Sequence, residues 1–93
     1  MNFESVRNFQ ETLVFARVME VAPQYPRLEH SQDLLVDAAC IALNALKPRY
    51  IRYNVDLSFH LLDRDRAEAE ADVNAAVDAA FKLLSAGRRK EDR

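Results

Sequence analysis

The side chains of this 93-residue chain that are best suited to chemistry gather between positions 37 and 52. They are Asp37, Asn44, Lys47, Arg49, Tyr50 and Arg52. Arginine presents a planar fork of donors that fits a phosphate or a guanine edge, and tyrosine can stack on a flat base. A carboxylate can accept the N–H groups of guanine. The components of a nucleotide pocket are therefore present within one short segment.

The same residues also have a purely structural interpretation. Basic residues that follow a helix suit its free carbonyl groups and its dipole. Asp37 and Asn44 can hydrogen-bond a buried loop, as buried polar groups must. The residues alone leave both interpretations open.

Asp37 and Asn44 can act together only if the segment that contains them forms a helix with both residues on one face. They are the only polar residues from Leu34 to Leu46, so this stretch is predicted to form a central helix that is buried on most sides. Positions 37 and 44 are about two turns apart and share a face. The helix must stop near Lys47, because Pro48 disfavours the helical conformation of the residue before it.

Two details of the central helix are also predicted. Ser31 or Asp33 caps its N-terminus by accepting hydrogen bonds from free backbone N–H groups. Cys40 lies within the apolar stretch and is interpreted as an inert core residue.

Two further helices are predicted, over residues 4–22 and 64–86. The first carries two apolar stripes, which indicates burial against both the chain's own core and a partner. These stripes are Val6, Phe9, Leu13 and Ala16, and then Val14, Val18 and Val21. The last helix carries one stripe, made of Val73, Ala76, Val77, Ala80, Phe81 and Leu84. Gly87 is placed to end it, and residues 22–30 form a loop in which Tyr25 can pack over the core.

Residues 51–61 alternate between apolar and polar types, which is typical of a strand with one apolar face. A lone strand cannot satisfy its backbone hydrogen bonds, so it either bends near Asn54 into an irregular hairpin or pairs with a second chain. Because the segment has no glycine and no Asn-Gly turn, antiparallel pairing across a homodimer is favoured. The predicted fold class is α+β, mainly helical, with three helices and one long strand between the second and third.

Length and composition predict a single domain over residues 1–87 and a disordered charged tail over 88–93. Apolar residues make up 49% of this short chain, a surplus that indicates an oligomer. A net charge of −2 gives no general attraction to nucleic acid or anionic lipid. There is no membrane-spanning run and no signal peptide, and the single cysteine fits a reducing compartment. A cytoplasmic location is therefore predicted.

The segment ALNALKPRYI resembles the central motif of the late competence development protein ComFB family, which usually reads ALNxLPPRYV. VRNFQETLV near the start is similar to that family's N-terminal helix. RYNVDLSFHL and the acidic, alanine-rich helix after it are similar to the C-terminal half of its proteobacterial members. The resemblance covers residues 5–84.

Members of this family have been linked to binding of cyclic dinucleotide second messengers, chiefly cyclic di-GMP, so the resemblance implies such a ligand here. At positions that match the motif, it points to Asp37, Asn44, Arg49 and Tyr50, beside which Arg52 adds a second cation. Arg7 and Asn8, in the matched N-terminal segment, are further candidates if the first helix runs beside the motif. Their structural interpretation is a solvated helix face or a cap.

The chain departs from the family pattern in two places. Many members carry closely spaced cysteines before the central helix, which suit structural zinc, whereas this chain reads LEHSQDLLVD there. Cys40, His30 and His60 do not make the four-ligand set of such a site, so no metal is predicted. Lys47 stands where a second proline is usual, and it adds positive charge beside the predicted site.

The predicted function is a small dimeric receptor domain that binds a cyclic dinucleotide and signals to an unidentified protein partner. The chain has no nucleophile elbow, phosphate loop or paired-carboxylate motif, so neither catalysis nor a cofactor is expected. His60 is interpreted as an exposed strand histidine. The alternative is a ComFB-like structural or adaptor module that acts through protein–protein contacts without a ligand.

Overall fold

The computed structural model of the chain describes residues 3–48, 50–52 and 63–87. Its elements, in order, are η1 Phe3–Ser5, β1 Val6–Asn8, α1 Phe9–Val21, η2 Ala22–Gln24, α2 Pro26–Glu29, α3 Gln32–Ala45, β2 Tyr50–Arg52 and α5 Asp63–Ser85. The predicted helices over 4–22, 34–46 and 64–86 all have counterparts among these. None of the described helices is long and apolar enough to cross a membrane.

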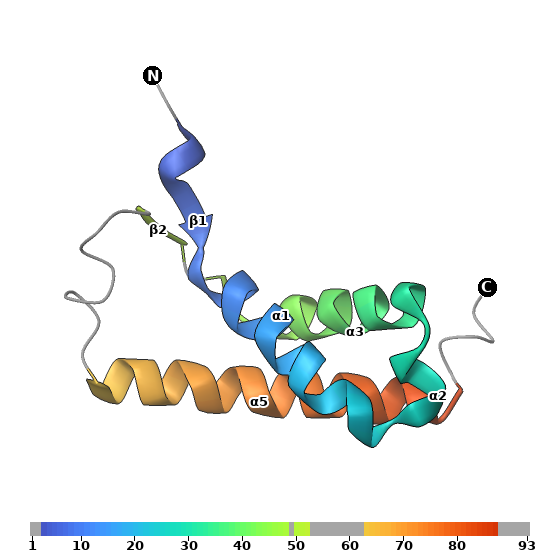
Figure 1. Cartoon of the computed structure of the whole chain (residues 1–93). Coiled ribbons are helices and arrows are strands. Elements are labelled where there is room, and N and C mark those ends of the chain that lie inside the picture. Colours follow the sequence, from blue (N-terminus) through green and yellow to red (C-terminus); the bar gives the residue numbers. More distant parts are fainter. Residues whose placement is uncertain (1–2, 49, 53–62, 88–93) are drawn as a thin grey trace.

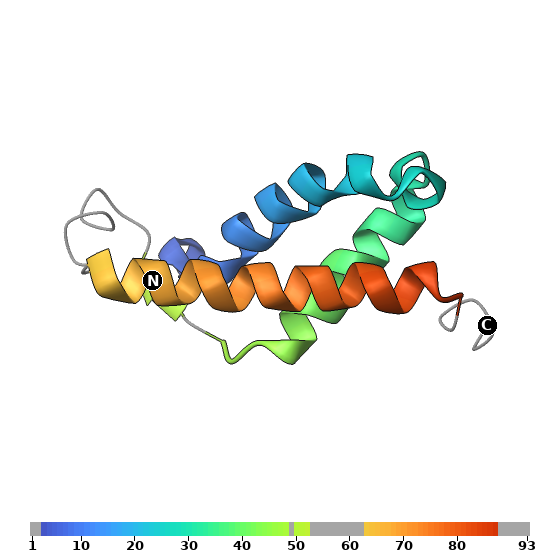
Figure 2. The ribbon, with the colours of Figure 1, turned by 90° about the horizontal axis from the view of Figure 1, so that it is seen from below.

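Helix α5 is the element on which the other helices pack. It contacts both α1 and α3, and these two also contact each other. Figure 1 shows α1 and α3 on the same side of α5, and Figure 2 shows that they meet near α2 and splay apart away from it. We call the α2 side the closed end of the helices and the opposite side the open end.

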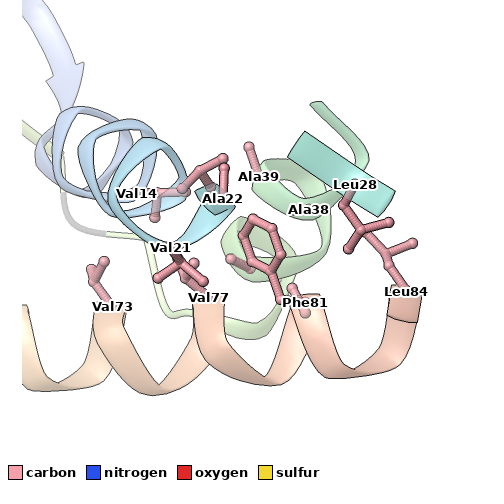
Figure 3. Packing of buried hydrophobic residues seen from close by; sticks show 13 residues of the cluster. Val14, Val21, Ala22, Leu28, Ala38, Ala39, Val73, Val77, Phe81 and Leu84 are labelled. Atoms are coloured by element: carbon pink, nitrogen blue, oxygen red, sulfur yellow. The ribbon is translucent and has the colours of Figure 1, made fainter. Parts of the chain in front are cut away.

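The core lies where the three helices meet. Phe81 of α5 is fully buried and points between α1 and α3, as Figure 3 shows. Its ring lies 5.1 Å from that of Tyr25, at an interplanar angle of 30°, which is within the usual range for aromatic pairs. The stripe predicted for the last helix is confirmed, since Val73, Val77, Ala80, Phe81 and Leu84 are buried and Ala76 packs against the cluster.

Helix α1 buries only one of its two predicted stripes. Val14, Val18 and Val21 are buried. Of the other stripe, Val6 lies in β1 and is 47% exposed, Ala16 is exposed, and Phe9 and Leu13 are half-buried, with Leu13 packed against the core cluster. The helix begins at Phe9 rather than at residue 4, because the residues before it form a strand. The second stripe is therefore only partly buried within this chain.

The prediction that the central helix is buried on most sides is wrong. Helix α3 buries Ala38, Ala39 and Ala42 alone, because α1 and α5 both pack against that one small-residue face. Val36, beside that face, is 61% exposed. Cys40 is exposed as well, so its interpretation as a core residue is also wrong.

The predicted long strand between the second and third helices is contradicted. The described residues contain four α-helices and only two strands of three residues each. β2 pairs with β1 of the same chain, antiparallel, so the pairing partner is the N-terminal segment and not a second copy. Residues 53–61 of the predicted strand, which include His60, lie outside the described residues, and so does the predicted tail over 88–93. A period-two pattern favours an extended backbone, but it does not determine which strand supplies the hydrogen-bond partners.

The connections at the closed end follow their residue types. Ser31 caps α3, because its hydroxyl oxygen accepts a hydrogen bond from the N–H of Leu34 at 3.2 Å, as predicted. The segment predicted as a loop holds a 3-10 turn and the short helix α2. Gly87 has a φ of 78°, a left-handed conformation that favours glycine.

Candidate ligand site at the open end

The β1–β2 ribbon joins the two sequence segments that carry the predicted ligand-binding residues. Val6 lies opposite Arg52, Arg7 opposite Ile51, and Asn8 opposite Tyr50. The condition set for Arg7 and Asn8 was that the first helix runs beside the motif. These residues lie in strand β1 instead of a helix, and it is this strand that pairs with the motif residues of β2. The side chains of Arg7 and Arg52 are not described, and Arg49 lies outside the described residues.

Asn8 has a defined structural task at this position. It precedes α1, and its side-chain oxygen accepts a hydrogen bond from the backbone N–H of Gln10 at 3.1 Å. This is an N-cap interaction, which satisfies one of the free N–H groups of the helix. The capping interpretation of Asn8 is confirmed, and directly opposite it Tyr50 is 68% exposed.

The other predicted residues lie on α3. Asp37 is half-buried near the middle of the helix, and Asn44 is exposed in its last turn. They share a face of the helix, as their spacing predicted. Asn44 lies near the ribbon in sequence, whereas Asp37 is two turns further from the open end.

A hollow of about 600 Å³ opens at the end of α3. Its lining comes from the start of α1, the end of α3 and the middle of α5. These residues are Gln10, Ala45, Leu46, Lys47, Asp72, Ala75 and Ala76. Gln10 and Lys47 are each within three positions of the paired residues Asn8 and Tyr50, so the ribbon and the hollow adjoin along the chain. A volume of this size falls within the range of small-molecule sites.

Sequence reasoning missed Gln10. It is 2% exposed, and among the described residues it is the only polar residue in the buried class. A signal was present, because Gln10 precedes Val14 by four positions and so stands on the stripe that forms the α1 core face. A polar residue at a core position is the kind of exception that marks a site.

A separate polar cluster lies between α1 and α5. Arg17 donates hydrogen bonds to Glu20 at 2.7 Å and to Asp78 at 3.2 Å. The hydrogen bond to Glu20 raises the pKa of Arg17, partial burial lowers it, and the hydrogen bond to Asp78 raises it further. Both carboxylates are substantially exposed, so the cluster is an ion-pair link between helices rather than a catalytic arrangement.

The outer face between α1 and α3 is an apolar groove of about 540 Å³. Phe15, Met19 and Val36 line it and are 50%, 65% and 61% exposed. Large exposed apolar side chains gathered in one patch mark interaction surfaces more often than isolated ones do. The exposed apolar side chains of this groove are part of the apolar surplus that the composition indicated.

The chain matches the family model of the late competence development protein ComFB over residues 7–88. The match covers most of the chain, so the protein belongs to the ComFB family, as the central motif indicated. No curated protein and no solved structure matches the chain.

Proposed function

We propose that this protein is a receptor domain for a cyclic dinucleotide, with cyclic di-GMP as the preferred ligand. The observation that carries the proposal is the ribbon register, which sets Asn8 opposite an exposed Tyr50, three positions along the chain from Lys47 in the lining of a small-molecule-sized hollow. Stacking on an aromatic ring and a cation for phosphate are two elements of nucleotide recognition. Family membership agrees with a regulatory domain.

In this proposal each residue has a distinct role. Tyr50 stacks on a base, and Lys47, with Arg49 and Arg52, holds phosphate. Asn44 hydrogen-bonds the ligand from the last turn of α3, and Asp37 reads a base edge. Asn8 and Arg7 support the ribbon from the opposite strand.

Calorimetric titration with cyclic di-GMP, cyclic di-AMP and GTP tests the proposal. We expect micromolar or tighter binding of one cyclic dinucleotide and none of GTP. Tyr50→Ala and Arg49→Ala should abolish or strongly weaken binding, whereas Arg27→Ala, at an exposed position on α2 at the closed end, should not. The absence of binding to either cyclic dinucleotide by folded protein would refute the proposal and leave the adaptor function in its place.

The receptor is further proposed to act as a homodimer through the apolar groove of α1 and α3. A two-fold contact would cover Phe15, Met19 and Val36 of both copies at once. Light scattering at micromolar concentration should give twice the 10.7 kDa mass of one chain. Met19→Glu should yield monomer, whereas Leu83→Glu, a partly exposed position on α5, should leave the dimer intact. A wild-type monomer would refute this part and assign the groove to another protein.

No catalytic step is proposed. The test is to incubate the protein with the bound cyclic dinucleotide and separate the products by chromatography. The nucleotide should be recovered unchanged, and appearance of a linear dinucleotide or a mononucleotide would show an enzyme. Because cyclic dinucleotides are intracellular messengers, the proposed place of action is the cytoplasm.

A further inference from the structure

Gln10 is an anomaly that the fold itself does not explain. Its side-chain oxygen Oε1 is buried and accepts no hydrogen bond. Natural proteins rarely leave a buried acceptor unpaired, because it loses its bond to water without gaining another. Leucine at this position would continue the apolar stripe through Val14 and Val18 without that cost.

Gln10 is also one of the residues that line the hollow at the open end, together with Lys47 and Asp72. Both of these charged residues are exposed, so they stand toward solvent while Gln10 lies deeper. The hollow is therefore lined by a buried residue whose Oε1 is unpaired and by one exposed charge of each sign.

The walls between these polar groups are small and apolar. They are Ala45 of α3, Leu46 directly after it, and Ala75 and Ala76 of α5. Alanine side chains leave space for a flat ring, and apolar walls strengthen the hydrogen bonds formed between them. The ligand group that fits must be planar and must donate N–H groups toward Gln10.

We propose that Gln10 reads the base of the bound nucleotide, which inserts as a purine ring into this hollow. This inference rests on the proposed cyclic dinucleotide receptor and adds a residue and a subsite to it. An N–H group at the base edge donates to Oε1 of Gln10, and a second donates to the Asp72 carboxylate. Lys47 faces the phosphate that follows the base. A purine nucleotide supplies the flat ring, the N–H donors and the phosphate in one molecule.

The test compares Gln10→Leu with wild-type protein. Leucine is similar in volume and removes the unpaired acceptor, so the melting temperature should be unchanged or higher. Affinity for cyclic di-GMP in calorimetry should fall about tenfold or more, which corresponds to the loss of a good hydrogen bond. Gln32→Leu, at an exposed position on α3, is the matched control and should keep full affinity.

The outcomes separate this inference from the proposed function. If wild type and Gln10→Leu bind cyclic di-GMP equally, the receptor stands and the inference is wrong. A lower melting temperature for Gln10→Leu would also overturn it, because Gln10 would then be paired, for example by a buried water. If wild type binds no cyclic dinucleotide, the proposed function fails first. In that case, addition of GMP or AMP must shift the side-chain amide signal of Gln10 in an NMR spectrum, or the inference fails with it.

Discussion

The closed and open ends of the helices are built from similar elements but with opposite choices of side chain. At the closed end, Leu28 of α2 and Leu84 of α5 are almost fully buried, and Tyr25 stacks on Phe81. At the open end, a glutamine takes the buried position and a tyrosine is left in solvent. The closed end follows the rule that apolar groups go inside and the open end reverses it.

This difference predicts that residues of the closed end serve stability and residues of the open end serve the proposed binding. Burying an unpaired amide costs stability, and exposing a tyrosine ring gains none. A region that departs from the rules for a stable core at two neighbouring places is a candidate for function. The substitutions below test that division, from the largest expected effect to the smallest.

Phe81→Ala should produce the largest loss of stability. It removes a fully buried ring at the meeting point of α1, α3 and α5, and such changes cost about 3–5 kcal/mol. Urea unfolding followed by circular dichroism measures the change. Leu83→Ala, on the exposed side of the same helix, is the control and should cost well under half as much. Equal effects would mean that the core is not centred on Phe81.

A pair of alanine substitutions contrasts the two regions on one helix. Ala42 has no exposed surface, so Ala42→Leu overpacks the core and should cost about 1–3 kcal/mol. Ala45 is exposed and lines the hollow, so Ala45→Leu should leave stability nearly unchanged while it weakens cyclic di-GMP binding. Unfolding curves measure the stability of both variants, and calorimetry measures their affinity for cyclic di-GMP. Tight ligand binding by Ala45→Leu would argue against the hollow as the site.

The two helix caps form a second contrast. Asn8→Ala and Ser31→Ala each remove one N-cap hydrogen bond, and each should cost about 1 kcal/mol. Only Asn8 lies in the ribbon beside Tyr50, so only Asn8→Ala should also weaken ligand binding. Loss of binding in Ser31→Ala would show that affinity follows general stability and not the open end.

The smallest effect is expected for the ion pair between α1 and α5. Asp78→Asn removes a partner of Arg17 at a partly exposed position, where such pairs are worth less than about 1 kcal/mol. The pKa of Arg17 is raised in the folded protein. The stability that this charge contributes is therefore fully present below the pKa of the unfolded state, and it is lost only in strongly alkaline solution, as the pH rises through the folded-state pKa. Thermal unfolding in low and high salt measures the effect, which salt should diminish in wild type. A loss of stability comparable to that of Phe81→Ala would mean that the ion pair is buried and excluded from water.

Local signals in the sequence predicted the helical framework well. The stripe from Val73 to Leu84 predicted a helix over 64–86, and α5 spans Asp63–Ser85. Ser31 and Gly87 were assigned to helix ends, where the structure places them. These features depend on residues within a few positions of one another, so the chain carries the information locally.

The long strand and the burial of the central helix could not be predicted from local signals in the same way. Apolar residues around α3 indicate burial but do not say whether the covering surface comes from the same chain, a second chain or solvent-facing neighbours. The alternation after Pro48 predicts an extended backbone, yet its pairing with Val6–Asn8 joins segments more than 40 positions apart. Only packing in three dimensions decides such pairings.

The sequence by itself thus determined the positions and ends of the main helices, the family motif and the residue types from which a nucleotide site is proposed. The tertiary structure alone decided which face of each helix is buried, because burial depends on which helices meet. It also decided that the start of the chain lies beside Tyr50, and that Gln10, a polar residue on the apolar stripe of α1, is buried with its Oε1 unpaired and lines a hollow.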